Sequence, residues 1–125
     1  MNVMRLSVLR IVIVAGLLLP LSATAGTAEV EIDNLLSTMG RSDCVFIRNG
    51  KRHNAEDAED HLRMKLRRGK RYVTTTESFI ERLASSSSMS KKPYYIECPG
   101  QEKTPTGEWL MQRLAELREN PGEGK

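Results

Sequence analysis

Two histidines and a run of four serines are the side chains of this 125-residue chain that could perform catalysis. A serine becomes a nucleophile when a base lies within hydrogen-bond reach and an oxyanion hole faces it. Ser85–Ser88 could supply the nucleophile, with His53 or His61 as the base. The chain has no Gly-x-Ser-x-Gly motif to support this chemistry. A small hydrolase is therefore the alternative hypothesis, because serines in this setting are more typical of a helix end.

A metal site is the second chemistry that the histidines could provide. Asp57, His61 and Lys65 lie at four-residue steps, which places them on one face of a helix, and His53 precedes that helix. The chain lacks the His-x-x-x-His and His-Glu-x-x-His spacings that bind zinc, and a clear third ligand is missing. We therefore expect no metal and no other cofactor, and we expect His61 to form a hydrogen bond at the edge of the core.

The N-terminus has the three parts of a cleavable secretory signal. Arg5 and Arg10 give a positive start, an apolar run follows at 11–21, and an Ala-Thr-Ala triplet ends the segment. The apolar run is shorter than the roughly 20 residues of a membrane-spanning helix. We therefore expect residues 1–25 to be removed and the remaining domain to be exported without a membrane span.

Cys44 and Cys98 are the only cysteines, and an exported chain meets an oxidising compartment. The simplest inference is a disulfide between them. A redox pair or a metal site is less favoured, because the chain has no Cys-x-x-Cys spacing.

The net charge of the exported domain argues against nucleic-acid binding. All the acidic residues follow the signal, which holds Arg5 and Arg10, so its removal lowers the formal net charge from +3 to +1. A local concentration of six cations remains and could attract an anionic partner, or it could be a solvated helix end. These cations are Arg63, Lys65, Arg67, Arg68, Lys70 and Arg71.

Apolar residues at three- and four-residue spacing predict four helices. The first spans Thr27–Met39, and the second runs from its cap, Asn54, to about Arg68. A Thr74-x-x-Glu77 capping box opens the third, which frays within the four serines, and Thr106 caps the last.

Short segments rich in β-branched and aromatic residues predict the strands. Cys44–Arg48 is a strand, Asn49-Gly50 favours a type I′ turn, and Lys51–His53 is a short return strand. Pro93–Cys98 is a second main strand, followed by a loop at Pro99–Pro105.

This order of elements predicts an α+β fold. Four helices surround a small antiparallel sheet of two to three short strands, and one disulfide holds the sheet together. We expect a single domain over residues 26–120 and a disordered tail at 121–125.

Five short pieces of the domain, in the same order, resemble the YfeK-like family of small exported proteins of Gram-negative bacteria, a domain of unknown function. The pieces are Phe46-Ile47-Arg48-Asn49-Gly50; Ala58 with His61-Leu62-Arg63 and Lys65; Thr76 with Phe79-Ile80 and Ala84 to Ser88; Lys92-Pro93-Tyr94; and Trp109-Leu110 with Leu114. Lys91 departs from the pattern, which commonly has Gly there. The resemblance implies a periplasmic location and one compact domain, and it brings no activity. The motif residues whose role is unknown are Arg48, Asn49, Gly50, His61, Ser85 and Ser86.

The sequence therefore favours a non-enzymatic periplasmic domain that binds an envelope protein or an anionic component of the envelope. The alternatives are an envelope hydrolase that uses Ser85–Ser88 with His53 or His61, and an inhibitor or immunity-type protein.

Overall fold

The computed structural model of the protein describes residues 15–16 and 25–121. Nearly all of the predicted signal segment, and residues 122–125 of the predicted tail, lie outside the described residues, so both stay predictions. Across the described part of the chain, no helix has the length and apolar character needed to cross a membrane.

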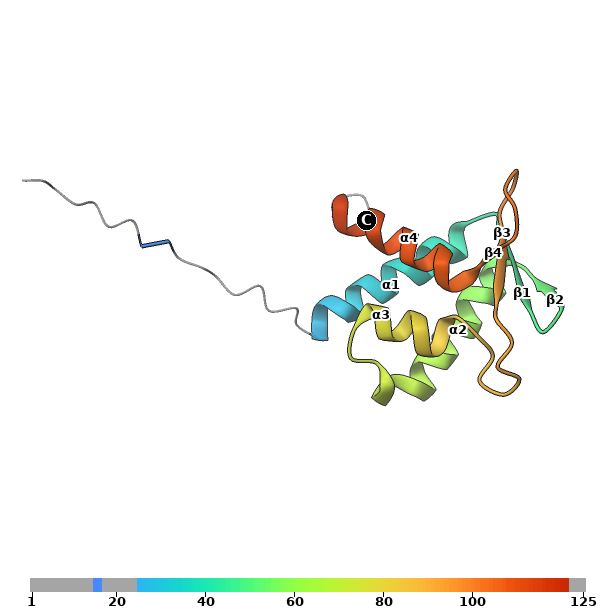
Figure 1. The fold of residues 1–125 in the computed structure, drawn as a ribbon, viewed down its shortest axis with the longest axis horizontal. Helices are drawn as coiled ribbons and strands as arrows, with labels where there is room; N and C mark the ends of the chain where they lie inside the picture. Colours follow the sequence, from blue (N-terminus) through green and yellow to red (C-terminus); the bar gives the residue numbers. More distant parts are fainter. Residues whose placement is uncertain (1–14, 17–24, 122–125) are drawn as a thin grey trace, which may run out of the picture.

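Within residues 25–121, four α-helices form where the apolar spacing predicts them (Figure 1). They are α1 (Ala25–Arg41), α2 (Ala55–Gly69), α3 (Thr76–Phe79) and α4 (Thr106–Glu119). The chain continues from α3 as a π-helical turn at Ile80–Ala84, so the predicted third helix is formed in two parts. A 3-10 turn at Lys70–Tyr72 follows α2. Asn54 caps α2 as predicted, because its side chain accepts a hydrogen bond from the Asp57 amide at 2.8 Å.

Four short strands of the described chain pair into one antiparallel sheet, in the order β2-β1-β3-β4. They are β1 (Val45–Arg48), β2 (Lys51–His53), β3 (Tyr95–Glu97) and β4 (Thr104–Pro105). The α+β class is confirmed, but the expectation of two to three strands is wrong. The fourth strand, β4, lies in the predicted loop Pro99–Pro105. It is two residues long and contains a proline, so it has no strand pattern of its own and forms by pairing with the edge of β3.

The predicted capping box of the third helix is shifted by one residue. It forms between Thr75 and Ser78, not between Thr74 and Glu77. The Ser78 amide donates to the Thr75 hydroxyl at 3.0 Å, and the Thr75 amide donates to the Ser78 hydroxyl at 2.9 Å. Serine thus takes the role that the sequence pattern assigns to glutamate.

Thr106 does not cap α4, as the sequence predicts, but is its first helical residue after Pro105. The Thr106 amide donates to the Tyr94 carbonyl at 2.9 Å, so it extends the contact between β4 and the β3 side of the sheet. Its hydroxyl is buried and has no hydrogen-bond partner among the described residues.

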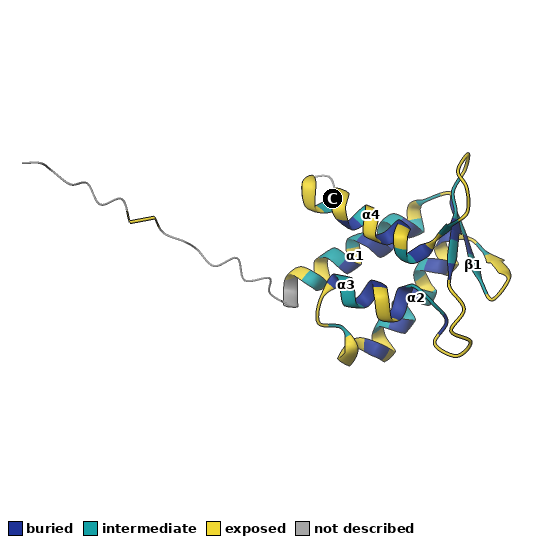
Figure 2. Ribbon diagram, in the orientation of Figure 1, coloured by how far each residue is buried: buried dark blue, intermediate teal, exposed yellow. Residues whose placement is uncertain are grey.

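The helices cover one face of the sheet, and the core lies between the two layers (Figures 1 and 2). Phe46 of β1 and Ile96 of β3 supply the buried side chains of the sheet. Among the side chains of α1 to α4, the most completely buried are Leu36, Met39, Leu62, Phe79 and Leu110.

The predicted disulfide between Cys44 and Cys98 is confirmed. It joins the start of β1 to the end of β3, next to the paired residues Val45 and Glu97. The bond closes a loop with a sequence separation of 54 residues. In the chain-entropy account, closing a loop of this size stabilises the fold by about 4 kcal/mol.

Two residues other than glycine have a positive φ in the described chain, and both lie in turns. Asn49 (φ 49°) and Gly50 (φ 78°) form the predicted type I′ turn between β1 and β2. Lys91 (φ 62°) is the position where the resemblance described above commonly has glycine. The backbone there needs the left-handed region, which explains why glycine suits the position.

Replacing Lys91 by glycine is expected to raise the free energy of unfolding by about 1 kcal/mol. The reason is that a side chain in the left-handed region costs roughly 1–2 kcal/mol, partly offset by the entropy that glycine loses on folding. Urea denaturation at pH 7 measures the effect. Lys92→Gly is the matched control, because Lys92 has no positive φ and should lose stability. A Lys91→Gly protein no more stable than the wild type would contradict the strain at this residue.

Candidate functional site

A pocket of about 510 Å³ lies between the end of β1, the outer part of α2 and the segment at 87–94. Its lining contains four basic side chains and no aspartate or glutamate. These basic residues are Arg48, His61, Lys65 and Arg68. The remaining polar groups come from Tyr94, Asn49 and the serines at 87, 88 and 90. The pocket is therefore electropositive.

Lys65 holds a buried ammonium at the centre of this site, since the residue is only 8% exposed. The ammonium donates to the Ser86 carbonyl at 2.7 Å and to the Tyr94 hydroxyl at 3.1 Å. Both acceptors are neutral, and among residues 25–121 no carboxylate forms an ion pair with Lys65. Burial, followed by the positive charges of Arg48 and Lys91, lowers the pKa of Lys65 to about 8.

His61 connects Arg48 to Tyr94. Burial, followed by the positive charges of Arg48 and Lys65, lowers the pKa of His61 to about 4, so the imidazole is neutral at pH 7. Nη1 of Arg48 lies 3.1 Å from Nδ1 of His61, and Nε2 of His61 lies 3.1 Å from the Tyr94 hydroxyl. The tautomer protonated on Nε2 satisfies both contacts, because Nδ1 then accepts from Arg48 and Nε2 donates to Tyr94.

The Tyr94 hydroxyl is the point where these contacts meet. In this tautomer it accepts hydrogen bonds from Lys65 and His61, which occupies both of its lone pairs. Its own proton has no acceptor among the described residues and can be donated to a ligand. Burial raises the pKa of Tyr94, although Arg48 opposes this, so the group stays a neutral donor at pH 7. The ring packs edge-on against Phe46, with 5.0 Å between the ring centroids.

Three of the motif residues, Arg48, Asn49 and His61, line the pocket. The Asn49 side-chain carbonyl accepts a hydrogen bond from the Ser90 hydroxyl at 2.6 Å, which fastens the segment after the serines to the β1–β2 turn. Gly50 completes that turn and does not line the pocket.

Three of the four serines have structural contacts. The Ser85 hydroxyl donates to the Ile80 carbonyl at 2.6 Å, Ser86 offers its carbonyl to the buried lysine, and the Ser87 hydroxyl accepts from the Ser90 amide at 3.3 Å. In residues 25–121, no hydrogen bond joins a serine hydroxyl to either histidine. The contact between nucleophile and base that a serine hydrolase needs is thus not formed in the described part of the chain.

The two histidines lie on different elements, His53 on β2 and His61 on α2. Nε2 of His53 is buried and has no hydrogen-bond partner among the described residues. That part of the chain contains no group of three or more His, Cys, Asp or Glu side chains that could hold a metal ion.

Two of the six cations between Arg63 and Arg71 form ion pairs. Arg63 pairs with Glu59 at 2.8 Å and with Asp33 at 2.9 Å. Lys70 pairs with Glu29 at 3.3 Å. These two cations therefore link α2 and the residue after it to α1.

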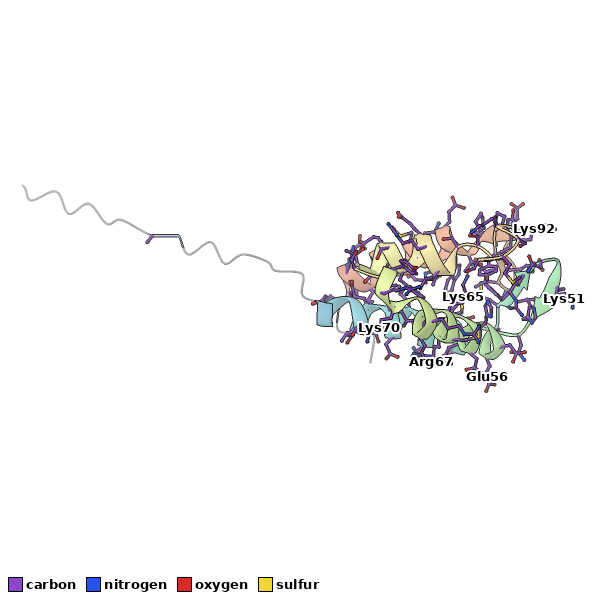
Figure 3. All side chains as sticks on the ribbon, turned by 90° about the horizontal axis from the view of Figure 1, so that it is seen from below. Lys51, Glu56, Lys65, Arg67, Lys70 and Lys92 are labelled. Carbon is purple, nitrogen blue, oxygen red and sulfur yellow. A yellow bond between two sulfur atoms is a disulfide. The ribbon has the colours of Figure 1, made fainter. Side chains whose placement is uncertain are left out.

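The other four cations divide between the pocket and the outer surface. Lys65 and Arg68 line the pocket. Arg67 and Arg71 are exposed, and the Arg71 guanidinium lies 4.8 Å from the Tyr72 ring centroid. In Figure 3 Lys65 lies over the middle of the domain, whereas Arg67 lies along the outer edge of α2. The structure thus divides the predicted patch. Of its six cations, Lys65 and Arg68 line the pocket, where Arg48 of β1 joins them.

Sequence reasoning placed Lys65 in a surface patch and gave Tyr94 no role in a site. A signal for Lys65 was present, because Ala58, Leu62, Lys65 and Gly69 lie at three- and four-residue steps and form the buried side of α2. A lysine at an apolar position of an amphipathic helix indicates a buried charge with a function or a partner.

The free energy of unfolding is expected to fall as the pH decreases from 6.5 to 4. His61 titrates near 6.5 in the unfolded chain and at about 4 in the folded one, so the unfolded state binds the extra proton in this window. Because His61 is partly exposed, we expect a loss on the order of 2 kcal/mol. Urea denaturation at several pH values measures it.

The variant His61→Gln isolates this effect, since its stability should vary less between pH 6.5 and 4 than that of the wild type. Equal pH dependence in the wild type and in His61→Gln would show that a neutral, half-buried His61 is not part of the fold.

Comparison with known proteins identifies the family. Residues 26–118 match the profile of DUF5329, a family of unknown function. The uncharacterized protein YfeK of Salmonella typhimurium is 42% identical over 85 residues, which cover 65% of this chain and 71% of the Salmonella protein. No solved structure gives a significant match. The chain therefore belongs to the YfeK-like family of unknown function, DUF5329.

Proposed function

We propose that this protein is a non-enzymatic binding domain of the periplasm, and that its pocket binds an anionic group of an envelope component. The observation that carries the proposal is the buried Lys65 ammonium, whose acceptors are neutral oxygens. A buried charge without a counterion is costly, and an anion in the pocket would remove that cost. The pocket lining has no carboxylate of its own to do so.

Three donors of the site are available to such an anion. Lys65 has a third N–H beyond its two bonds, and the Tyr94 hydroxyl has its own proton. Among the described residues, the guanidinium of Arg48 forms hydrogen bonds with His61 alone, which leaves most of its N–H groups for a ligand. Hydrogen bonds between these groups and an oxyanion would be charge-assisted, which is the stronger kind.

The periplasmic location rests on the export signal and is supported by the disulfide. The segment 1–25 has the charge, apolar run and small residues of a cleavable signal. The Cys44–Cys98 bond suits an oxidising compartment, where disulfides form and persist.

Inorganic phosphate tests the anion site. We expect a phosphate titration at pH 7 and constant ionic strength to shift the NMR signals of the pocket residues in a saturable manner. Arg48→Gln and Lys65→Met should each weaken the affinity by about tenfold or more, since each removes a charged donor. Arg67→Gln removes the same charge from the outer face of α2 and should leave the affinity unchanged.

Lys65→Met should also raise the free energy of unfolding by about 1–2 kcal/mol, because an apolar side chain replaces an uncompensated buried charge. Loss of phosphate binding in a more stable protein excludes unfolding as the cause. The proposal would fail if phosphate produced no saturable shift, or if Arg67→Gln weakened binding as much as Arg48→Gln.

The intact mass of the protein recovered from a periplasmic fraction tests the location. We expect a chain that starts at Gly26 and gains two hydrogen atoms on reduction of the Cys44–Cys98 bond. Ala25→Arg should block cleavage and leave the longer precursor in the membrane fraction. Recovery of a chain starting at Met1 from the cytoplasmic fraction would contradict the proposed export.

A further inference from the structure

The pocket that holds the cations also has an apolar wall. Met64 and Tyr72 supply this wall from α2 and the 3-10 turn, Leu83 from the π-helical turn, and Met89 from the segment before β3. Of the four exposed large hydrophobic residues in the described chain, Tyr72 and Met89 are two, with exposures of 50% and 95%. Half of the large apolar side chains that are open to solvent therefore gather at the electropositive pocket.

Along α2 and the turn after it, His61 and Lys65 line the pocket before Gly69 and Tyr72, and Met64 and Arg68 are interspersed among them. Arg48, His61, Lys65 and Tyr94 are joined by hydrogen bonds and form the polar end. The apolar end lies beyond the last turn of the helix, where Gly69 and Tyr72 line the pocket together with Leu83.

Gly69 allows the Leu83 side chain to pack closely on α2 at the apolar end of the pocket. A Cβ atom at this position would lie 2.8 Å from Cδ2 of Leu83. The leucine therefore packs directly on the helix backbone and forms an apolar floor.

The size of the pocket indicates a ligand larger than a small inorganic anion. Its volume of about 510 Å³ lies within the roughly 300–1,000 Å³ of sites that hold drug-sized molecules. A phosphate or carboxylate bound at the cations would leave the apolar wall uncovered. An apolar chain attached to the same anion would cover it and gain the free energy of burying that surface.

We infer that the ligand is a single-chain amphiphile, with an anionic head group at Arg48, Lys65 and Tyr94 and an apolar chain along Met64, Tyr72, Leu83 and Met89. The inference rests on the proposed function, because it assigns the rest of the ligand to the same anion site. Charge complementarity orients the molecule, since the head faces the cations and the chain faces the side chains that now contact water.

Binding of dodecyl phosphate, measured by calorimetry below its micelle concentration, tests this inference. We expect it to bind at least about 100-fold more tightly than inorganic phosphate, because several methylene groups become buried. Met89→Ser should weaken dodecyl phosphate binding by about fivefold and leave inorganic phosphate binding unchanged. Met111→Ser is the matched control: this exposed methionine lies outside the pocket, and its replacement should change neither affinity.

Two further ligands keep the dodecyl chain and test the contribution of the head group. Dodecanoate has the same chain with a carboxylate head, and its affinity relative to dodecyl phosphate distinguishes a fatty-acid head from a phosphate head. Dodecyl maltoside has the same chain with a neutral head, and we expect it to bind far more weakly than either anion.

The outcomes distinguish this inference from the proposed function. If inorganic phosphate binds and dodecyl phosphate binds no more tightly, the amphiphile is wrong and the anion site stands. If dodecyl maltoside and dodecyl phosphate bind equally and Lys65→Met changes neither, the site is apolar and the proposed anion site is wrong. If no ligand binds, both are overturned.

Discussion

The hydrogen bonds of the Lys65 ammonium are the interaction on which the geometry of the pocket depends. They join α2 to the Ser86 carbonyl and to the Tyr94 hydroxyl, so one side chain holds together a helix, the segment after the π-helical turn and the start of the β3 side of the sheet. Tyr94 connects this contact to β1 and to His61, because its ring packs on Phe46 and its hydroxyl forms a hydrogen bond with His61. His61 in turn accepts the hydrogen bond that holds Arg48 at the end of β1.

This arrangement of cations lowers the free energy of unfolding of the domain, but it suits a site that binds an anion. Burial, followed by the positive charge of Arg48, lowers the pKa of Lys65, and burial, followed by the charges of Arg48 and Lys65, lowers the pKa of His61. An apolar residue at position 65 would serve the fold better. Proteins keep such unfavourable groups where a ligand supplies the missing charge, and stability and function then oppose each other. The disulfide stabilises the same sheet and offsets part of this cost.

Much of the fold could be predicted from the sequence, because the signals involved are local. Asn49-Gly50 favours a type I′ turn, Asn54 caps α2, and the two cysteines pair with each other. β4 could not be predicted, since a Thr-Pro dipeptide has no strand pattern and pairs only because β3 presents a free edge. The site was predicted in parts. Arg48 and His61 were singled out, and Lys65 and Arg68 were grouped with cations that lie elsewhere. Their convergence depends on how α2 packs against the sheet, which no local pattern contains.

We propose that Lys65 is a buried cation whose positive charge is compensated when an anion binds in the pocket. Its ammonium titration, followed by the NMR signal of the adjacent Cε carbon with and without phosphate, tests this most directly. The account predicts a pKa of about 8 in the free protein and a clear rise when phosphate is present, because a bound anion stabilises the charged form. A Lys65 pKa near the ordinary value for lysine, unchanged by phosphate, would contradict it.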